Sequence, residues 1–252
     1  MSEWSGAPMT RPETADASAV HTVLVELFTS QGCSSCPPAD RLLTKLGQES
    51  DGRVVPLSFH VDFWNHLGWS DPFSRADWTQ RQMAYATIFR LSNVYTPEAV
   101  VDGRTEMVGS DENRLGAAIK AAAALPSAEI SLRLEPTDSK VLVTADIDVP
   151  KALRGRKLDL MLAVFETTLV TNVGRGENSG RVLRNDYVVR SLERAARIVA
   201  AAPDRVRKTA ALALAREWKR SELGVAAFLQ DPKSLEILGA NSRLLSDRRP
   251  HG

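Results

Sequence analysis

The sequence contains little cysteine and no long hydrophobic run. Cys33 and Cys36 are the only cysteines among the 252 residues, which excludes a fold stabilised by several disulfide bonds within the chain. A membrane-spanning helix needs about 18 or more largely apolar residues. The alanine run at 121–124 is short, and Pro126 follows it closely. We therefore expect no membrane span.

The chain also lacks an excess of either charge. Its 32 Lys and Arg residues balance 31 Asp and Glu residues, which leaves a formal net charge of +1. Proteins that bind the phosphate backbone usually carry a clear basic excess, so we expect no nucleic-acid partner. The hydrophobic fraction of 43% and the charged fraction of 25% are typical of an ordinary globular protein.

The first 19 residues lack the basic and then apolar order of a secretory signal. They are rich in Ser, Thr, Pro, Ala and Asp, and we interpret residues 1–19 as a disordered lead-in. As the sequence stands, this favours a cytoplasmic location. The cysteine pair does not decide the compartment, because redox-active thiols operate in reducing and oxidising environments alike.

The first half of the chain alternates predicted strands and helices. Apolar runs predict strands at 22–29 and 54–61, and helical spacing predicts helices at 39–46, 74–91 and 111–125. Two short segments, 99–103 and 106–108, predict a hairpin. Strands that alternate with helices imply an α/β unit with a parallel or mixed sheet.

The pattern changes to consecutive strands after Pro126. Strands are predicted at 128–134, 140–149, 158–170, 186–199, 208–218 and 224–229, although residues 210–216 have helical propensity. We therefore predict an α/β domain over residues 20–126, followed by a smaller, mostly β, sandwich-like domain over residues 127–249.

The spacing Cys33-Ser34-Ser35-Cys36 is the strongest chemical signal. Thiol–disulfide exchange needs one thiolate that attacks and a second thiol close enough to resolve the mixed disulfide. At the start of a helix the thiolate is stabilised by free N–H groups and the helix dipole, so we predict that Cys33 attacks and Cys36 resolves. A structural disulfide, a zinc site that also uses His60 and His66, and a fold that has lost catalysis remain alternatives.

The surroundings of this motif resemble the thioredoxin superfamily. Residues 22–29 place an apolar strand before the cysteines, a helix follows them, and Thr96-Pro97 precedes the strand near 99–103. The resemblance implies an α/β thioredoxin-like domain in which the Thr96–Pro97 bond is cis and lies against the cysteine pair. A proline bond tolerates the cis form at small cost.

A narrower resemblance covers most of residues 22–240. The segments ELFTSQGCSSCPPAD (26–40), HVDFWNHLGWSDPF (60–73), GENSGR (176–181) and AFLQDP (227–232) are similar to the domain-of-unknown-function 1223 family, a largely bacterial, thioredoxin-like group. Its members usually carry a secretion signal, which implies a periplasmic or secreted location. The resemblance brings no established substrate.

Several residues outside the motif are candidates for the site. Glu26, seven positions before Cys33, is either a buried acid that moves a proton or a strand-end acid held by a side-chain partner. The loop from His60 to Trp69 is rich in aromatic residues. We predict that it forms a groove wall with His60, Asp62 and Trp64, next to Thr96; alternatively, its aromatic side chains only cover the helix at 74–91.

The sequence therefore supports two functional hypotheses. In the first, the protein is a thiol–disulfide oxidoreductase in which Cys33 attacks, Cys36 resolves, Pro97 shapes the groove and Glu26 moves protons. It would act on a protein or small-molecule thiol or disulfide, without a cofactor or a metal. In the second, it is a non-catalytic binding or assembly module.

The glycines near residues 174–178 precede no helix and no Lys-Ser/Thr pair, so we interpret them as a loop between β elements and not as a phosphate loop.

Overall fold

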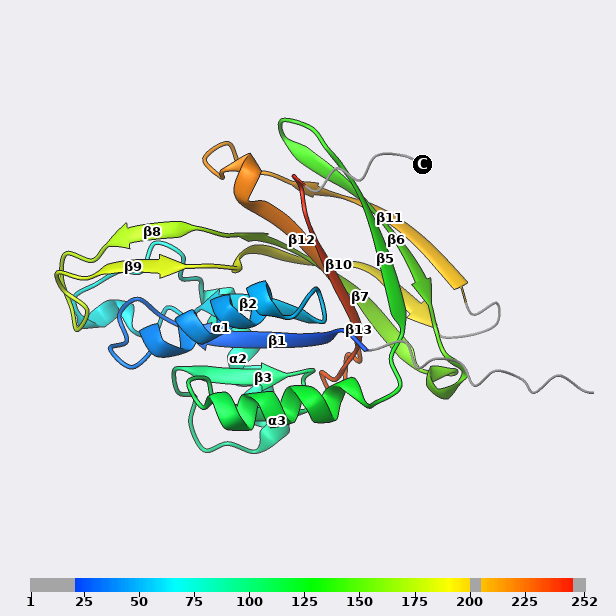
Figure 1. Ribbon diagram of the computed structural model, residues 1–252, viewed down its shortest axis with the longest axis horizontal. Coiled ribbons are helices and arrows are strands. Elements are labelled where there is room, and N and C mark those ends of the chain that lie inside the picture. The colour runs from blue at the N-terminus through cyan, green and yellow to red at the C-terminus, as the bar shows by residue number, and fades with distance from the viewer. Residues whose placement is uncertain (1–20, 200–204, 247–252) are drawn as a thin grey trace, which may run out of the picture.

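The computed structural model describes residues 21–199 and 205–246, so the predicted lead-in at 1–19 lies outside the described residues. The described chain contains three α-helices and thirteen strands (Figure 1). The helices are α1 (Pro37–Glu49), α2 (Ala76–Phe89) and α3 (Glu112–Ala123). The strands are β1 (Val23–Thr29), β2 (Val54–His60), β3 (Glu98–Val101), β4 (Thr105–Val108), β5 (Glu129–Pro136), β6 (Lys140–Asp148), β7 (Lys157–Glu166), β8 (Leu169–Asn172), β9 (Val182–Asn185), β10 (Val188–Val199), β11 (Arg205–Ala213), β12 (Leu223–Gln230) and β13 (Ile237–Leu244).

One mixed sheet of eight strands runs through the molecule in the order β13-β12-β7-β10-β2-β1-β3-β4. Strand β2 lies parallel to β1 on one side and parallel to β10 on the other. The remaining neighbours in this sheet are antiparallel. Strands from the first and second halves of the chain therefore share one hydrogen-bonded sheet.

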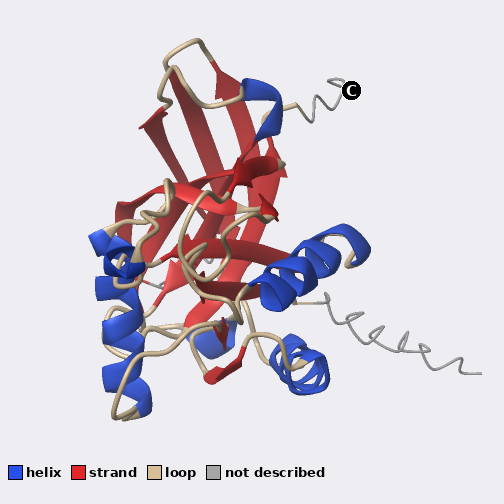
Figure 2. Cartoon of the chain, turned by 90° about the vertical axis from the view of Figure 1, so that its left-hand side faces the viewer, coloured by secondary structure: helices blue, strands red, loops and turns tan. Residues whose placement is uncertain are grey.

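The helices cover both faces of the large sheet around β1 (Figure 2). Alternate residues of β1, including Val25 and Leu27, pack with apolar residues of α1 and α3. The intervening residues, including Leu24 and Phe28, pack with Trp78 of α2 and with side chains of β2, β7, β10 and β12. The two-residue period of a strand thus directs β1 into two separate cores.

A second sheet, in the order β11-β6-β5, packs against the other end of the large sheet. Its inward side chains, such as Ile130 and Val143, meet Leu160 of β7 and Val225 of β12 in a third apolar cluster. A separate hairpin of β8 and β9 extends from the large sheet toward the start of α1. This hairpin matters for the site because its tip reaches the cysteine loop.

The expected fold class, an α/β thioredoxin-like domain followed by a smaller β domain, is wrong. The protein is mostly β and is organised around the large mixed sheet. The prediction failed because the local pattern of β2 does not reveal its second neighbour. The Ser58 amide donates to the carbonyl of Tyr187 at 2.8 Å, which joins β2 to the start of β10. Such long-range strand pairing is set by tertiary packing.

Many individual elements were nevertheless predicted correctly. Helices α1, α2 and α3 and strands β1, β2, β5, β6, β7, β10 and β12 lie where the pattern placed them, within a few residues. The predicted hairpin is β3–β4, and its strands are joined by residues 102–104. Asp102 and Gly103 in this turn have φ values of 46° and 63°, the left-handed backbone conformation that tight hairpin turns use. Strands β9 and β13 were missed, and the single strand predicted at 158–170 is divided into β7 and the start of β8. The helical propensity at 210–216 was misleading, because β11 extends to Ala213.

Among the described residues, no helix is long and apolar enough to cross a membrane.

Candidate functional site

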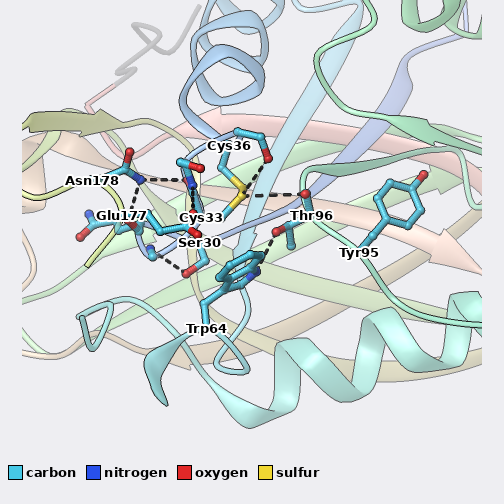
Figure 3. The surroundings of a disulfide bond; sticks show 12 residues. Ser30, Cys33, Cys36, Trp64, Tyr95, Thr96, Glu177 and Asn178 are labelled. Atoms are coloured by element: carbon cyan, nitrogen blue, oxygen red, sulfur yellow. Dashed lines mark hydrogen bonds between the residues drawn. A yellow bond between two sulfur atoms is a disulfide. The ribbon is translucent and has the colours of Figure 1, made fainter. Parts of the chain in front are cut away.

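The two cysteines form a disulfide where the loop after β1 enters α1 (Figure 3). Their Cα atoms lie 5.5 Å apart. Cys36 is the N-cap residue of α1, and Pro37 and Pro38 occupy the first helical positions. Proline suits these positions because their N–H groups have no partner within the helix. The predicted order of strand, cysteine loop and helix is confirmed.

The backbone before β3 approaches the disulfide closely. The Thr96–Pro97 bond is cis, and the carbonyl oxygen of Thr96 lies 3.8 Å from the Cys33 sulfur. The Ser35 hydroxyl lies 3.3 Å from the same sulfur. The structure therefore confirms the prediction that this proline bond is cis and lies beside Cys33.

Trp64 joins the aromatic loop to this site. Its indole Nε1 donates a hydrogen bond to the Thr96 hydroxyl at 2.8 Å. A Cβ at Gly32, next to Cys33, would lie 3.0 Å from the Trp64 Cβ, so the loop backbone packs tightly on this tryptophan. The structure thus brings Trp64, Thr96 and Pro97 together around the cysteine pair.

Asp62 and His60, the other two residues predicted in the groove wall, make different contacts. Asp62 accepts a hydrogen bond from the Thr79 hydroxyl at 2.6 Å and so ties its loop to α2. His60 has no exposed surface, and its Nδ1 lies 2.7 Å from a carboxylate oxygen of Asp71. His60 therefore lies beneath the site and does not line an open groove.

The His60–Asp71 contact is a buried ion pair. Burial by itself would lower the pKa of His60, but attraction to the Asp71 carboxylate and the hydrogen bond between them outweigh it and raise this pKa. The pKa of Asp71 is lowered, because the same contact outweighs the cost of its own burial. The backbone N–H of Gln31 also donates a hydrogen bond to the Asp71 carboxylate at 2.8 Å, which links the His60–Asp71 pair to the cysteine loop.

Asp40 completes a buried polar cluster under α1. It lies one helical turn after Cys36, and burial raises its pKa to about 6 although the neighbouring His60 charge opposes this. In the described part of the chain, three buried atoms here have no hydrogen-bond partner: Asp40 Oδ1, Thr29 Oγ1 and His60 Nε2. Asp40 was not among the predicted site residues, although its position four residues after Cys36 in a predicted helix was a signal for it.

Glu26 does not join the cysteines. Its carboxylate accepts hydrogen bonds from the Tyr85 hydroxyl and, at 2.6 Å, from Arg81 Nε, both on α2. Its strand neighbours Leu24 and Phe28 pack with α2, whereas Val25 and Leu27 pack with α1. Glu26 therefore faces the side of the sheet opposite the cysteine helix, where it anchors α2.

The tip of the β8–β9 hairpin holds the cysteine loop from the other side. Asn178, which is fully buried, donates from Nδ2 to the carbonyls of Gln31 and Cys33, both at 2.9 Å. Glu177 accepts a hydrogen bond from the Ser34 amide, also at 2.9 Å. The sequence correctly indicated a loop between β elements here but gave no sign that it contacts the cysteines, about 140 residues earlier.

The Gln31 side chain strengthens this attachment. It donates from Nε2 to the Thr171 hydroxyl at 3.0 Å and to Asn185 Oδ1 at 2.9 Å, one on each strand of the hairpin. Its Oε1 accepts from Trp69 Nε1 at 3.2 Å. The cysteine loop, the aromatic loop and the hairpin are therefore joined through one buried glutamine.

Within residues 21–199 and 205–246, no group of three or more His, Cys, Asp or Glu side chains is arranged to hold a metal ion.

The chain belongs to the family described as "Protein of unknown function (DUF1223)", which matches residues 24–230. The match includes the cysteine loop, the aromatic loop and the hairpin tip. No curated protein matches the chain.

Two solved structures are similar over most of the chain. Protein AGR_C_4864 from Agrobacterium tumefaciens is 29% identical, with a TM-score of 0.69, and the match covers 92% of this chain and 98% of that one. HBP35 of Porphyromonas gingivalis is 18% identical, with a TM-score of 0.68, and the match covers 91% of this chain and 77% of that one. At such low identity the second similarity concerns the fold alone.

Proposed function

We propose that the protein is a thiol–disulfide oxidoreductase that acts through Cys33 and Cys36. The observation that carries this proposal is the disulfide between them at the start of α1, with the Thr96 carbonyl 3.8 Å from the Cys33 sulfur. The helix N-terminus favours a thiolate at the cysteines. The backbone near Thr96 and the Trp64 ring would form the wall against which a substrate lies.

The proposed reaction exchanges one disulfide for another. The Cys33 thiolate attacks a substrate disulfide, which forms a mixed disulfide and releases the first substrate thiol. Cys36 then attacks the Cys33 sulfur, re-forms the Cys33–Cys36 bond and releases the second substrate thiol. The substrate gains the two electrons and two protons that the cysteine pair loses, and the reverse reaction follows the same steps.

Proton transfer in this scheme is assigned to Asp40 in place of Glu26. Asp40 lies one turn after Cys36 on the same helix, and its pKa of about 6 lets it exchange a proton near neutral pH. Glu26 is held by α2 on the opposite face of the sheet. His60 and Asp71 would hold the polar surroundings of Asp40 in place.

A specific observation favours the second candidate function, a non-catalytic binding or assembly module. Neither Cys33 nor Cys36 has exposed surface, and exchange requires a substrate sulfur to reach one of them. For an oxidoreductase, the exposed neighbours Ser34 and Ser35 or the hairpin tip must therefore move during turnover. For a binding module, the disulfide would resist reduction and its loss would leave partner binding unchanged.

The decisive experiment traps the intermediate. The reduced Cys36→Ser variant, incubated with glutathione disulfide, is expected to accumulate a mixed disulfide on Cys33, because attack occurs and resolution does not. Intact-mass measurement and peptide mapping detect the adduct. The matched Cys33→Ser variant should form none and should lose turnover of a model disulfide. Absence of the adduct on Cys33 in Cys36→Ser would contradict the proposal. So would faster alkylation of Cys36 than of Cys33 in the reduced wild-type protein.

A further inference from the structure

The hairpin tip places a carboxylate directly at the cysteine motif. Glu177 Oε2 accepts the hydrogen bond from the backbone amide of Ser34, the residue that follows Cys33, at 2.9 Å. The neighbouring residue, Asn178, holds the hairpin tip against the cysteine loop by donating a hydrogen bond to the Cys33 carbonyl. The hydrogen bonds from Ser34 lower the pKa of Glu177, so the carboxylate is ionised at neutral pH.

This contact withdraws a hydrogen-bond donor from the surroundings of Cys33. A thiolate is stabilised by backbone amides that donate to it, and Pro37 and Pro38 at the start of α1 have no N–H to offer. The Ser34 amide, in the loop before α1, is the first backbone amide after Cys33. Here that amide already donates to Glu177. The negative charge of Glu177 also lies within a few ångströms of the loop in which the Cys33 thiolate would form, and like charges repel.

We propose that Glu177 is a positioning residue that disfavours the Cys33 thiolate and thereby favours the disulfide over the reduced pair. This inference rests on the proposed function, since it assigns a regulator of the same cysteines. By linkage, the effect is reciprocal: a thiolate at Cys33 weakens the Glu177 contact with Ser34 and loosens the hairpin tip. Reduction would therefore uncover the sulfur that the oxidised form buries.

Other charged groups near the pair act from different elements. The hairpin also contributes Arg181, whose Nη1 lies 3.0 Å from Asn178 Oδ1. Asp40 lies in the first turn of α1, and it interacts with the charges of the buried His60–Asp71 pair. Glu98, after Pro97, turns to the α2 side and bonds to Gln82. Among these, Glu177 is the group bonded to the backbone between the two cysteines.

The test compares the acidity of Cys33 in reduced full-length variants. Glu177→Gln keeps a hydrogen-bond acceptor but removes the charge, and Glu177→Ala removes both. The alkylation rate of Cys33 against pH, followed by peptide mass mapping, gives the thiolate pKa. For Glu177→Gln we expect this pKa to fall by roughly half a unit, about threefold in thiolate fraction at low pH. Glu177→Ala should lower it at least as far, because the Ser34 amide also becomes free.

A matched control removes one negative charge from the far end of α1. Glu49→Gln, an exposed change in the last turn of α1, should leave the pKa of Cys33 unchanged. An unchanged or higher pKa in Glu177→Gln overturns this inference. If the Cys36→Ser variant still traps a mixed disulfide, that outcome leaves the proposed function standing. If trapping fails while the pKa falls as expected, the proposed function alone is overturned, because alkylation needs no substrate.

Discussion

At the scale of single residues, the site consists of two buried cysteines, two exposed serines between them, and a buried ionisable cluster. Ser34 and Ser35 are exposed, whereas Asp40, His60 and Asp71 are buried under the start of α1. Buried charges are costly unless they are paired. His60 and Asp71 pair with each other, and Asp40 instead has its pKa raised to about 6 by burial.

The raised pKa of Asp40 predicts a specific pH dependence of stability. From about pH 4 to pH 6 the folded protein keeps a proton on Asp40 that the unfolded chain releases, so this residue's contribution to stability falls as pH rises through that window. The Asp40→Asn variant does not lose stability in this way as pH rises, because asparagine does not titrate. Relative to wild type, its unfolding free energy should increase by up to about 3 kcal/mol between pH 4 and pH 7.

Urea unfolding at several pH values measures this difference. Gln48→Ala, an exposed change in α1 that removes no titratable group, offers a comparison. Its difference from wild type should not change between pH 4 and pH 7. A pH-independent difference for Asp40→Asn would show that burial does not perturb Asp40 as described.

At the scale of elements, the β8–β9 hairpin stabilises the cysteine loop through few contacts. Asn178 bonds to two loop carbonyls, and Gln31 returns bonds to both strands of the hairpin. Because these groups are buried, each lost partner leaves a polar atom unsatisfied. The loop conformation therefore depends on an element that follows it by more than 130 residues.

Replacing Asn178 should weaken this attachment. We expect Asn178→Ala to reduce the unfolding free energy by about 1–3 kcal/mol, because two buried carbonyls lose their donor. We also expect faster reduction of the Cys33–Cys36 bond by dithiothreitol, measured by trapping free thiols over time. Asn172→Ala, an exposed change in β8 of the same hairpin, is the control and should alter neither quantity. Equal reduction rates in both variants would exclude a role for the hairpin in covering the disulfide.

At the scale of the whole molecule, the parallel pairing of β2 with β10 joins the two halves of the chain. The apolar cluster around α2 contains Phe59 of β2, Phe165 of β7 and Phe228 of β12. Arg81 of α2 lies over the Phe228 ring, 5.7 Å from its centroid, and binds Glu26 of β1. The elements near the cysteines are therefore stabilised in part by packing against strands β7 and β12 from the second half of the chain.

We predict a single unfolding transition for both halves. Phe228→Ala should lower the unfolding free energy by about 3–5 kcal/mol, because a large, fully buried side chain leaves a cavity. Tryptophan fluorescence and circular dichroism should shift to the same lower midpoint. Separate transitions would instead support the proposed division into units at 20–126 and 127–249. Phe63→Ala, a partly buried change in the aromatic loop, provides a milder comparison.

The sequence by itself determined the local structure around the site. The apolar run of β1, the spacing of Cys33 and Cys36, and Pro37 at the first position of α1 specify strand, loop and helix through short-range effects. Thr96-Pro97 was correctly placed beside Cys33 because the resemblance supplied that contact. Only the tertiary structure decided which strands lie beside β2, which face of the sheet Glu26 occupies, and that Glu177 and Asn178 reach the cysteine loop. These features depend on contacts between residues far apart in the chain. Such contacts are determined by the packing of the whole core, so the local pattern of apolar and polar residues does not reveal them.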